Sequence, residues 1–95
     1  MYFLTTIRIT GSIVDDCRTI GFNSSYGDLY RSVMNNAVDM FENGYYQYAV
    51  ITFIEEGFYP NEKEQQWFKY NKDNVIISSI ERPEILGDYK PYIIG

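Results

Sequence analysis

The residues that could carry chemistry in this chain are few, and most of them are carboxylates. There is no His, so the usual general base near neutral pH is absent, and the single thiol, Cys17, has no imidazole to activate it. The acidic pairs Asp15-Asp16 and Glu55-Glu56 are sequence neighbours, and adjacent side chains of a strand point to opposite faces, so neither pair predicts a carboxylate dyad. No ligand spacing indicates a metal site, no glycine-rich phosphate loop is present, and we expect no cofactor. The sequence therefore predicts a protein that is not an enzyme.

Aromatic side chains are abundant instead, with ten Tyr, six Phe and one Trp in 95 residues. Tyr presents a large area at low entropic cost and keeps a polar tip, which suits a surface that contacts a partner. The candidates gather in the runs Tyr45-Tyr46-Gln47-Tyr48 and Trp67-Phe68-Lys69-Tyr70. Together with two acids they predict an acidic, aromatic partner-binding set that comprises Tyr45, Tyr46, Tyr48, Glu55, Glu56, Trp67 and Tyr70. The alternative interpretation is that these rings form sheet core and a contact between two copies.

Arg8 and Arg18 are the most interesting positive charges. They lie on neighbouring predicted strands and could hold a phosphate or a carboxylate between them. With Lys69 beside aromatic rings they form an alternative ligand-binding set for a nucleotide. Alternation places Arg8 away from the apolar side of its strand and Arg18 on the apolar side of its own, which argues against a shared face. In the other interpretation the aliphatic part of each Arg side chain covers apolar surface, and its guanidinium group stays in water.

The balance of charge is acidic, with a formal net charge of −5. Residues 1–61 hold three basic residues against seven acids, so the clustered Lys and Arg that duplex nucleic acid requires are missing. A basic protein partner, or a partner that itself binds nucleic acid, fits this sign better, although the charge can also serve solubility alone. No long apolar run or signal peptide is visible, so we expect a cytoplasmic protein without a membrane contact.

The elements that must position these residues can be predicted from periodicity. Alternating or apolar runs predict five strands, at 2–10, 17–22, 45–56, 65–71 and 75–80. Gly21 indicates a bulge, and residues 11–16 and 71–74 indicate turns. A helix is predicted from Ser25, which caps it with Asp28 three residues later, to about Glu42, before Asn43-Gly44.

This order, β-β-α-β-β-β, predicts a single α+β domain over 1–95: an antiparallel sheet of four to five strands with one helix packed on one face. A helix of about 17 residues is roughly 25 Å long and covers one face only. The strand 45–56 is apolar on both faces, so the second face must be covered by the extended C-terminal tail 81–95, by a second copy or by a partner. We therefore also expect a homo-oligomer.

Several runs along most of the chain carry a resemblance. They are Phe3-Leu4-Thr5-Thr6-Ile7-Arg8, Arg18-Thr19-Ile20-Gly21-Phe22, Tyr48-Ala49-Val50-Ile51, Glu55-Glu56-Gly57-Phe58-Tyr59-Pro60, Trp67-Phe68, Arg82-Pro83-Glu84 and Ile93-Ile94-Gly95. On these runs the chain resembles small uncharacterised proteins encoded by phages and prophages of Gram-positive bacteria. Thr52 departs from that pattern, because many such proteins have an acidic residue there.

The resemblance implies a phage accessory protein in the cytoplasm of an infected host cell, and phage proteins of this size often inhibit host immunity. We therefore expect a non-enzymatic protein that binds and inhibits a host defence protein, such as a CRISPR nuclease, in the manner of an anti-CRISPR. One alternative is an oligomeric sponge that sequesters a nucleotide immune signal. Another is a structural or regulatory phage protein that only self-assembles.

Overall fold

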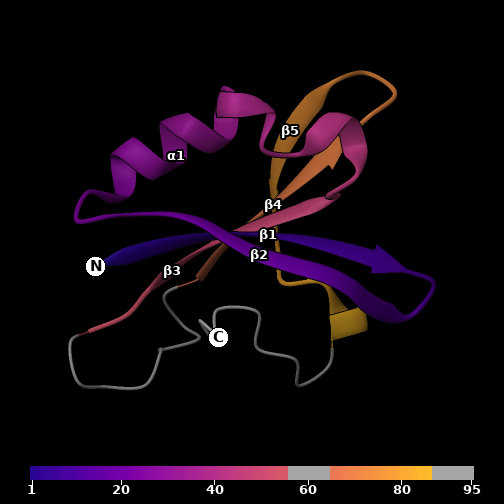
Figure 1. Ribbon diagram of the computed structural model, residues 1–95, viewed down its shortest axis with the longest axis horizontal. Coiled ribbons are helices and arrows are strands. Elements are labelled where there is room, and N and C mark those ends of the chain that lie inside the picture. Colours follow the sequence, from indigo (N-terminus) through magenta and orange to yellow (C-terminus); the bar gives the residue numbers. More distant parts are fainter. Residues whose placement is uncertain (56–64, 87–95) are drawn as a thin grey trace.

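The computed structural model describes residues 1–55 and 65–86, and these form an antiparallel sheet with one helix on one face (Figure 1). The five strands lie in the order β2-β1-β3-β4-β5. Their bounds are β1 Tyr2–Thr10, β2 Ile13–Asn23, β3 Tyr48–Phe53, β4 Gln65–Asn71 and β5 Ile76–Ile80, with α1 at Tyr26–Met34 between β2 and β3. The predicted α+β class and element order are confirmed. The predicted turn at 57–60 and residues 87–95 of the predicted tail lie outside the described residues.

Helix α1 begins where the sequence indicated but ends earlier. The Ser25 side chain caps it by accepting a hydrogen bond of 3.4 Å from the backbone N–H of Asp28. The helix ends at Met34, not near Glu42, because the Asn36 side chain competes for backbone groups and accepts a hydrogen bond from the N–H of Phe41. Two short 3-10 turns follow, at Ala37–Asp39 and Glu42–Gly44.

Strand β2 is longer than predicted, because Gly11 and Ser12 alone make the turn after β1. Asp15 and Asp16 therefore belong to a strand and not to a loop. The pairing of β2 with β1 has two register shifts, which leave Asp15 and Ile20 as extra, bulged residues. The second bulge lies directly before Gly21, where the sequence indicated one.

Strand β3 is shorter than the predicted 45–56. Gly44 has φ +95° and Tyr45 is in a helical conformation, so the chain is still turning at this point. Just before β3, the side-chain amide of Gln47 replaces backbone pairing by donating to the carbonyl of Ile9 at 2.9 Å and accepting from its N–H at 2.8 Å. Tyr45 and Tyr46 consequently lie in the turn before the strand.

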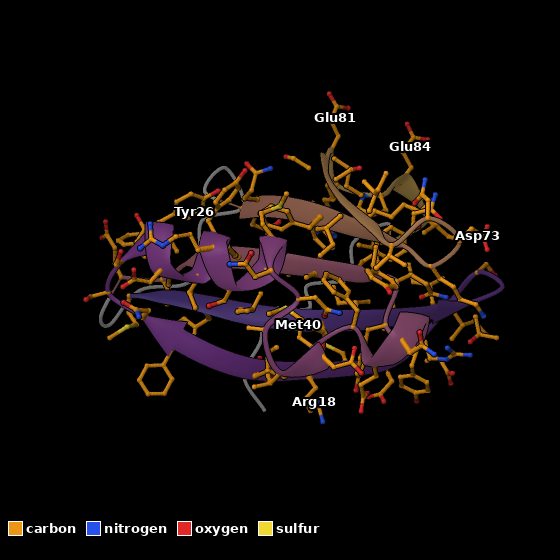
Figure 2. All side chains as sticks on the ribbon, turned by 90° about the horizontal axis from the view of Figure 1, so that it is seen from above. Arg18, Tyr26, Met40, Asp73, Glu81 and Glu84 are labelled. Atoms are coloured by element: carbon orange, nitrogen blue, oxygen red, sulfur yellow. The ribbon has the colours of Figure 1, made fainter. Side chains whose placement is uncertain are left out.

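Two apolar clusters form on the two faces of the sheet. The helix-side cluster is built from Leu4, Leu29, Val33, Met40, Phe41, Tyr46, Ala49, Ile51, Phe68 and Tyr70. Figure 2 looks onto this side, where Tyr26 of α1 and Met40 lie over the sheet. The cluster on the opposite face holds Ile7, Val50 and Trp67 together with Leu86, from the short 3-10 turn Glu84–Leu86. The prediction that the third strand is apolar on both faces is confirmed, and Leu86 packs on the second face within its own chain.

Candidate functional site

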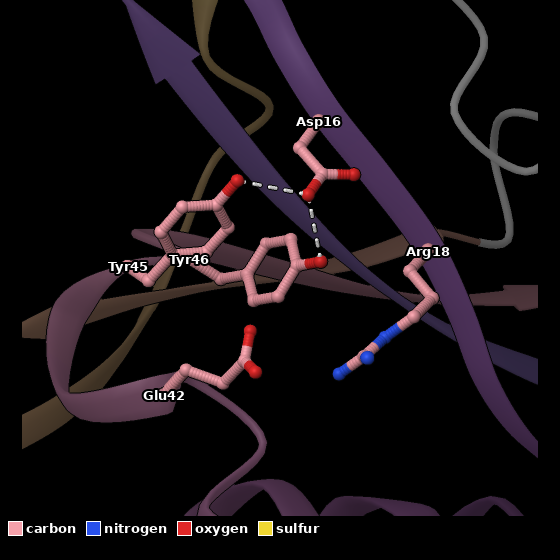
Figure 3. A pocket seen from close by; sticks show the side chains of 5 residues that line it. All are labelled: Asp16, Arg18, Glu42, Tyr45 and Tyr46. Atoms are coloured by element: carbon pink, nitrogen blue, oxygen red, sulfur yellow. Dashed lines mark hydrogen bonds between the residues drawn. The ribbon is translucent and has the colours of Figure 1, made fainter.

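An open hollow of about 470 Å³ lies where β2 meets the turn before β3 (Figure 3). Its lining comprises Asp16, Arg18, Glu42, Tyr45 and Tyr46. The first two side chains come from the helix-side face of β2, and the other three come from the turn 42–46. The hollow therefore depends on the two bulges that shape β2 and on the tight turns that follow α1.

Asp16 organises the hollow through one carboxylate oxygen. Its Oδ2 accepts hydrogen bonds from the hydroxyl of Tyr45 at 3.0 Å and from the hydroxyl of Tyr46 at 3.1 Å. These bonds, that of Tyr45 first, lower the pKa of Asp16 below its usual 3.8. The two rings meet edge to face with centroids 4.9 Å apart, so one carboxylate fixes a pair of aromatic rings.

The two tyrosines are alike in chemistry and different in exposure. Burial, and then the hydrogen bond to Asp16, raise the pKa of Tyr46 to about 12. The hydrogen bond to Asp16 is the main cause that raises the pKa of Tyr45, which is 41% exposed. Near neutral pH both phenols therefore stay protonated and donate to Asp16, and Tyr45 alone offers much of its ring to solvent.

Arg8 fixes Tyr45 from a second direction. Its Nε forms an ion pair of 3.1 Å with Asp15, its Nη1 donates to the backbone carbonyl of Tyr45 at 2.8 Å, and its guanidinium lies 4.4 Å from the centre of the Tyr45 ring. Arg18 is different, because its exposed guanidinium lies 5.4 Å from the Tyr46 ring and forms no ion pair within residues 1–55 and 65–86. Arg8 is thus committed to the wall of the hollow, whereas Arg18 can still bind a ligand.

The expectation that Arg8 and Arg18 lie on different faces was wrong. Arg8 is opposite Asp16 and Thr6 is opposite Arg18, and directly opposed residues share a face, as do residues two apart on one strand. The helix-side core lies on the Thr6–Arg8 side of β1, which the alternation of isoleucines had indicated as the solvent side. Arg8 and Arg18 therefore both lie on the helix-side face of the sheet.

Three members of the predicted partner-binding set are buried. Tyr46 and Tyr70 belong to the helix-side core, where the Tyr70 ring stacks on that of Phe41 with centroids 5.1 Å apart. Trp67 is buried on the opposite face, with the guanidinium of Arg82 5.4 Å from its ring. For these three rings the alternative interpretation, sheet core, describes what the structure shows.

The other predicted residues do not form one surface. Tyr45 lies at the hollow, but Tyr48 is half-buried on the opposite face, where Lys69 of β4 pairs with it. Lys69 is therefore remote from Arg18, and the predicted ligand set of Arg8, Arg18 and Lys69 does not converge. Glu55 follows the far end of β3, and Glu56 lies outside the described residues.

Two acids of the hollow, Asp16 and Glu42, were missed as site residues. One signal was present, since a two-residue turn at Gly11-Ser12 would place the Asp15-Asp16 pair opposite Arg8. For Glu42 no local signal exists. It reaches the hollow only because the chain makes two 3-10 turns in place of a continued helix.

The described part of the chain contains no group of three or more His, Cys, Asp or Glu residues that could hold a metal ion. Nor does any helix of residues 1–55 and 65–86 have the length and apolar character needed to cross a membrane. No protein-family model matches the chain, and no curated protein or solved structure matches it either. The resemblance to phage and prophage proteins stays a prediction, and a function has to be inferred from the geometry of the hollow.

Proposed function

We propose that this protein is a non-enzymatic binding module that holds a basic side chain of a protein partner at the hollow beside Tyr45. The observation that carries this proposal is the fixation of an exposed Tyr ring at three points. Asp16 holds its hydroxyl, while Arg8 holds its backbone carbonyl and lies beside its ring. A ring that is already ordered loses little entropy when a partner packs on it, which favours tight binding.

A second acid of the hollow, Glu42, offers a contact for a basic group. Glu42 lines the hollow and forms no ion pair within the described residues, so its carboxylate is available to a partner's Arg or Lys. The chain as a whole carries a net charge of −5, which steers it towards positively charged surfaces. Proteins that bind nucleic acid have such surfaces.

The partner class that we propose is a host defence protein with a basic, nucleic-acid-binding groove, which the phage accessory protein would block. The experiment is expression of the chain in bacteria that carry a CRISPR system, with phage plating as the readout. We expect the native chain to restore plating. Tyr45→Ala should abolish the effect, because truncation of a central aromatic contact typically weakens binding by roughly 30-fold.

The matched control is Phe22→Ala, which removes another exposed aromatic ring on the opposite face of the sheet. If Tyr45→Ala restores plating as well as the native chain and Phe22→Ala do, the hollow is not the contact surface. If the native chain fails to restore plating in bacteria with any of the defence systems tested, the anti-defence role is wrong.

Arg18 supports a second candidate, the sequestration of a small anionic ligand such as a nucleotide signal. Its guanidinium is exposed at the hollow, next to an ordered aromatic ring, and has no ion pair among the described residues. One pair of variants separates the two candidates, since Arg18→Gln removes a positive charge and Glu42→Gln a negative charge that form no ion pair among the described residues. Binding of a basic protein should weaken with Glu42→Gln only, and binding of a nucleotide with Arg18→Gln only. Calorimetry of the native chain with cyclic nucleotides tests the second candidate directly, and a flat trace would reject it.

A further inference from the structure

Among residues 1–55 and 65–86 the sheet has two edge strands, and within these residues only one of them is protected. An edge strand exposes unpaired N–H and C=O groups, and natural proteins limit pairing there with charges, bulges or proline. Strand β2 has two bulges and carries Asp15, Asp16 and Arg18. These features make β2 a poor template for another strand.

Strand β5, at the other edge, has none of these features. Its five pairs with β4 run from Trp67↔Ile80 to Asn71↔Ile76 without a register shift. The segment 75–80, Val-Ile-Ile-Ser-Ser-Ile, contains no charge and no proline. Val75 is 66% exposed and Ile76 is 52% exposed, and within the described residues β5 pairs with β4 alone. As far as the described part of the chain shows, this edge is regular, apolar and open.

We propose that β5 pairs antiparallel with β5 of a second copy of this chain, about a two-fold axis at Ser78, so that two five-stranded sheets join into one. This register pairs all five residues of the strand. Ser78 opposes itself, and Ile76 of each copy opposes Ile80 of the other. The Ile76 and Ile80 side chains lie on the face that also holds Trp67, so the apolar pairs continue the second core cluster across the interface.

A second copy fits this edge better than a strand of another kind. The segment is self-complementary about Ser78, with isoleucines at both ends and no charge that would repel its own copy. The flanking residues carry both signs, with Lys72 before the strand and Glu81 after it. Antiparallel pairing places the start of one β5 beside the end of the other, where opposite charges can meet.

This interface is independent of the hollow. The hollow is built on β2, and β5 forms the opposite edge of the sheet, with β1, β3 and β4 between them. Figure 2 shows Arg18 on the β2 side, away from Glu81, which follows β5. A dimer through β5 therefore leaves both copies of Tyr45 free, and loss of either function leaves the other testable.

The decisive variant is Ser78→Glu. Within one chain position 78 is opposite Lys69 of β4, so a Glu there gains a favourable cross-strand pair and the fold is retained. Across the two-fold axis the same Glu opposes its own copy. Sedimentation over a wide concentration range should show that the native chain dimerises and that Ser78→Glu weakens dimerisation by roughly tenfold or more. Ile13→Glu, which adds the same charge to an exposed position of β2, should leave the dimer unchanged.

Cross-linking provides the second measurement. Directly opposed residues of antiparallel strands have Cα atoms about 4.5–5.5 Å apart, within reach of a disulfide. With oxidised glutathione as the oxidant, Ser78→Cys should link two copies much faster than Ser24→Cys, which places a thiol on an exposed site remote from β5. A native chain that stays monomeric at every concentration overturns the proposal. A dimer that Ile13→Glu disrupts and Ser78→Glu does not also overturns it.

Discussion

The hydroxyl of Tyr46 donates a hydrogen bond of 3.1 Å to Oδ2 of Asp16, which lies 30 residues earlier in the chain. Tyr46 is buried in the helix-side core, whereas Asp16 belongs to the edge strand β2. The bond therefore ties the turn before β3 to the edge of the sheet and holds two walls of the hollow together. Stability and the shape of the hollow are coupled at this contact.

Replacing Tyr46 with Phe should lower the free energy of unfolding by about 1 kcal/mol, because one hydrogen bond to a carboxylate is lost while the ring stays in the core. Urea denaturation measures this change. Tyr48→Phe is the control, since no hydrogen bond of the Tyr48 hydroxyl is found within the described residues, and it should change the free energy by less than about 0.5 kcal/mol. An equal loss in both variants would mean that the Asp16 bond adds nothing.

Stability should fall in alkali because of the same tyrosine. The pKa of Tyr46 rises from 10.0 to about 12 in the folded chain, so the fold favours the protonated phenol. Its contribution is complete below pH 10 and is lost as the pH rises from 10 to about 12. Urea midpoints measured through this range should fall steeply for the native chain and less steeply for Tyr46→Phe. Parallel curves would contradict the assignment.

Acid should lower the stability of the fold through Asp16, which accepts the hydrogen bond from Tyr46. The pKa of Asp16 lies below 3.8 in the folded chain, so its ionised form stabilises the fold above that pH, and the contribution is lost as the pH falls further. Asp16→Asn should flatten the acid limb of the stability curve measured by circular dichroism. Asp73→Asn, in the exposed turn before β5, provides the comparison and should retain the acid limb of the native chain.

The parts of the fold that could be predicted are those with local causes. The strand Gln65–Asn71 was predicted with its observed bounds because alternation and the following turn both lie in the same short segment. The cap at Ser25 is local as well. The end of α1 was not predicted. Asn36 ends the helix with a side-chain hydrogen bond from the N–H of Phe41, and this bond forms only when the chain has already turned.

Of the five residues that line the hollow, Tyr45 and Tyr46 were predicted as partner contacts and Arg18 as a ligand contact, whereas Asp16 and Glu42 were not predicted. An excess of aromatic residues does not show which of the rings are buried in the core and which are exposed to a partner. Trp67 was predicted to meet a partner, and its burial depends on Leu86, nineteen positions later in the chain. Tertiary contacts of this kind have no signature in the spacing of residues, and they decide whether a ring is core or surface.

Val38 holds a conformation that its side chain disfavours, and relieving it should stabilise the protein. Its φ is 49° and its ψ is 27°, in the left-handed region that β-branched residues avoid, and its side chain is 95% exposed. Val38→Asn should raise the free energy of unfolding by about 1 kcal/mol, because Asn tolerates this region and no packing is lost.

The matched control at this position is Val38→Thr, which keeps the branched Cβ and adds a polar group. It should leave the melting temperature close to that of the native chain, while Val38→Asn raises it. A rise of the same size in both variants would point to the removal of an exposed apolar group, and not to the backbone, as the cause.

The last prediction concerns how the second face of the sheet is closed. Leu86 is 5% exposed and packs with Ile7, Val50 and Trp67, whereas its neighbour Ile85 is 47% exposed. Leu86→Ala should therefore lower the free energy of unfolding by about 2–3 kcal/mol, the cost of a core truncation with partial collapse, and Ile85→Ala by less than about 0.5 kcal/mol. Urea denaturation of the two variants at one protein concentration measures the difference. Because the contact lies within one chain, the loss in Leu86→Ala should be independent of protein concentration. A loss that disappears on dilution would mean that Leu86 is buried by a second copy.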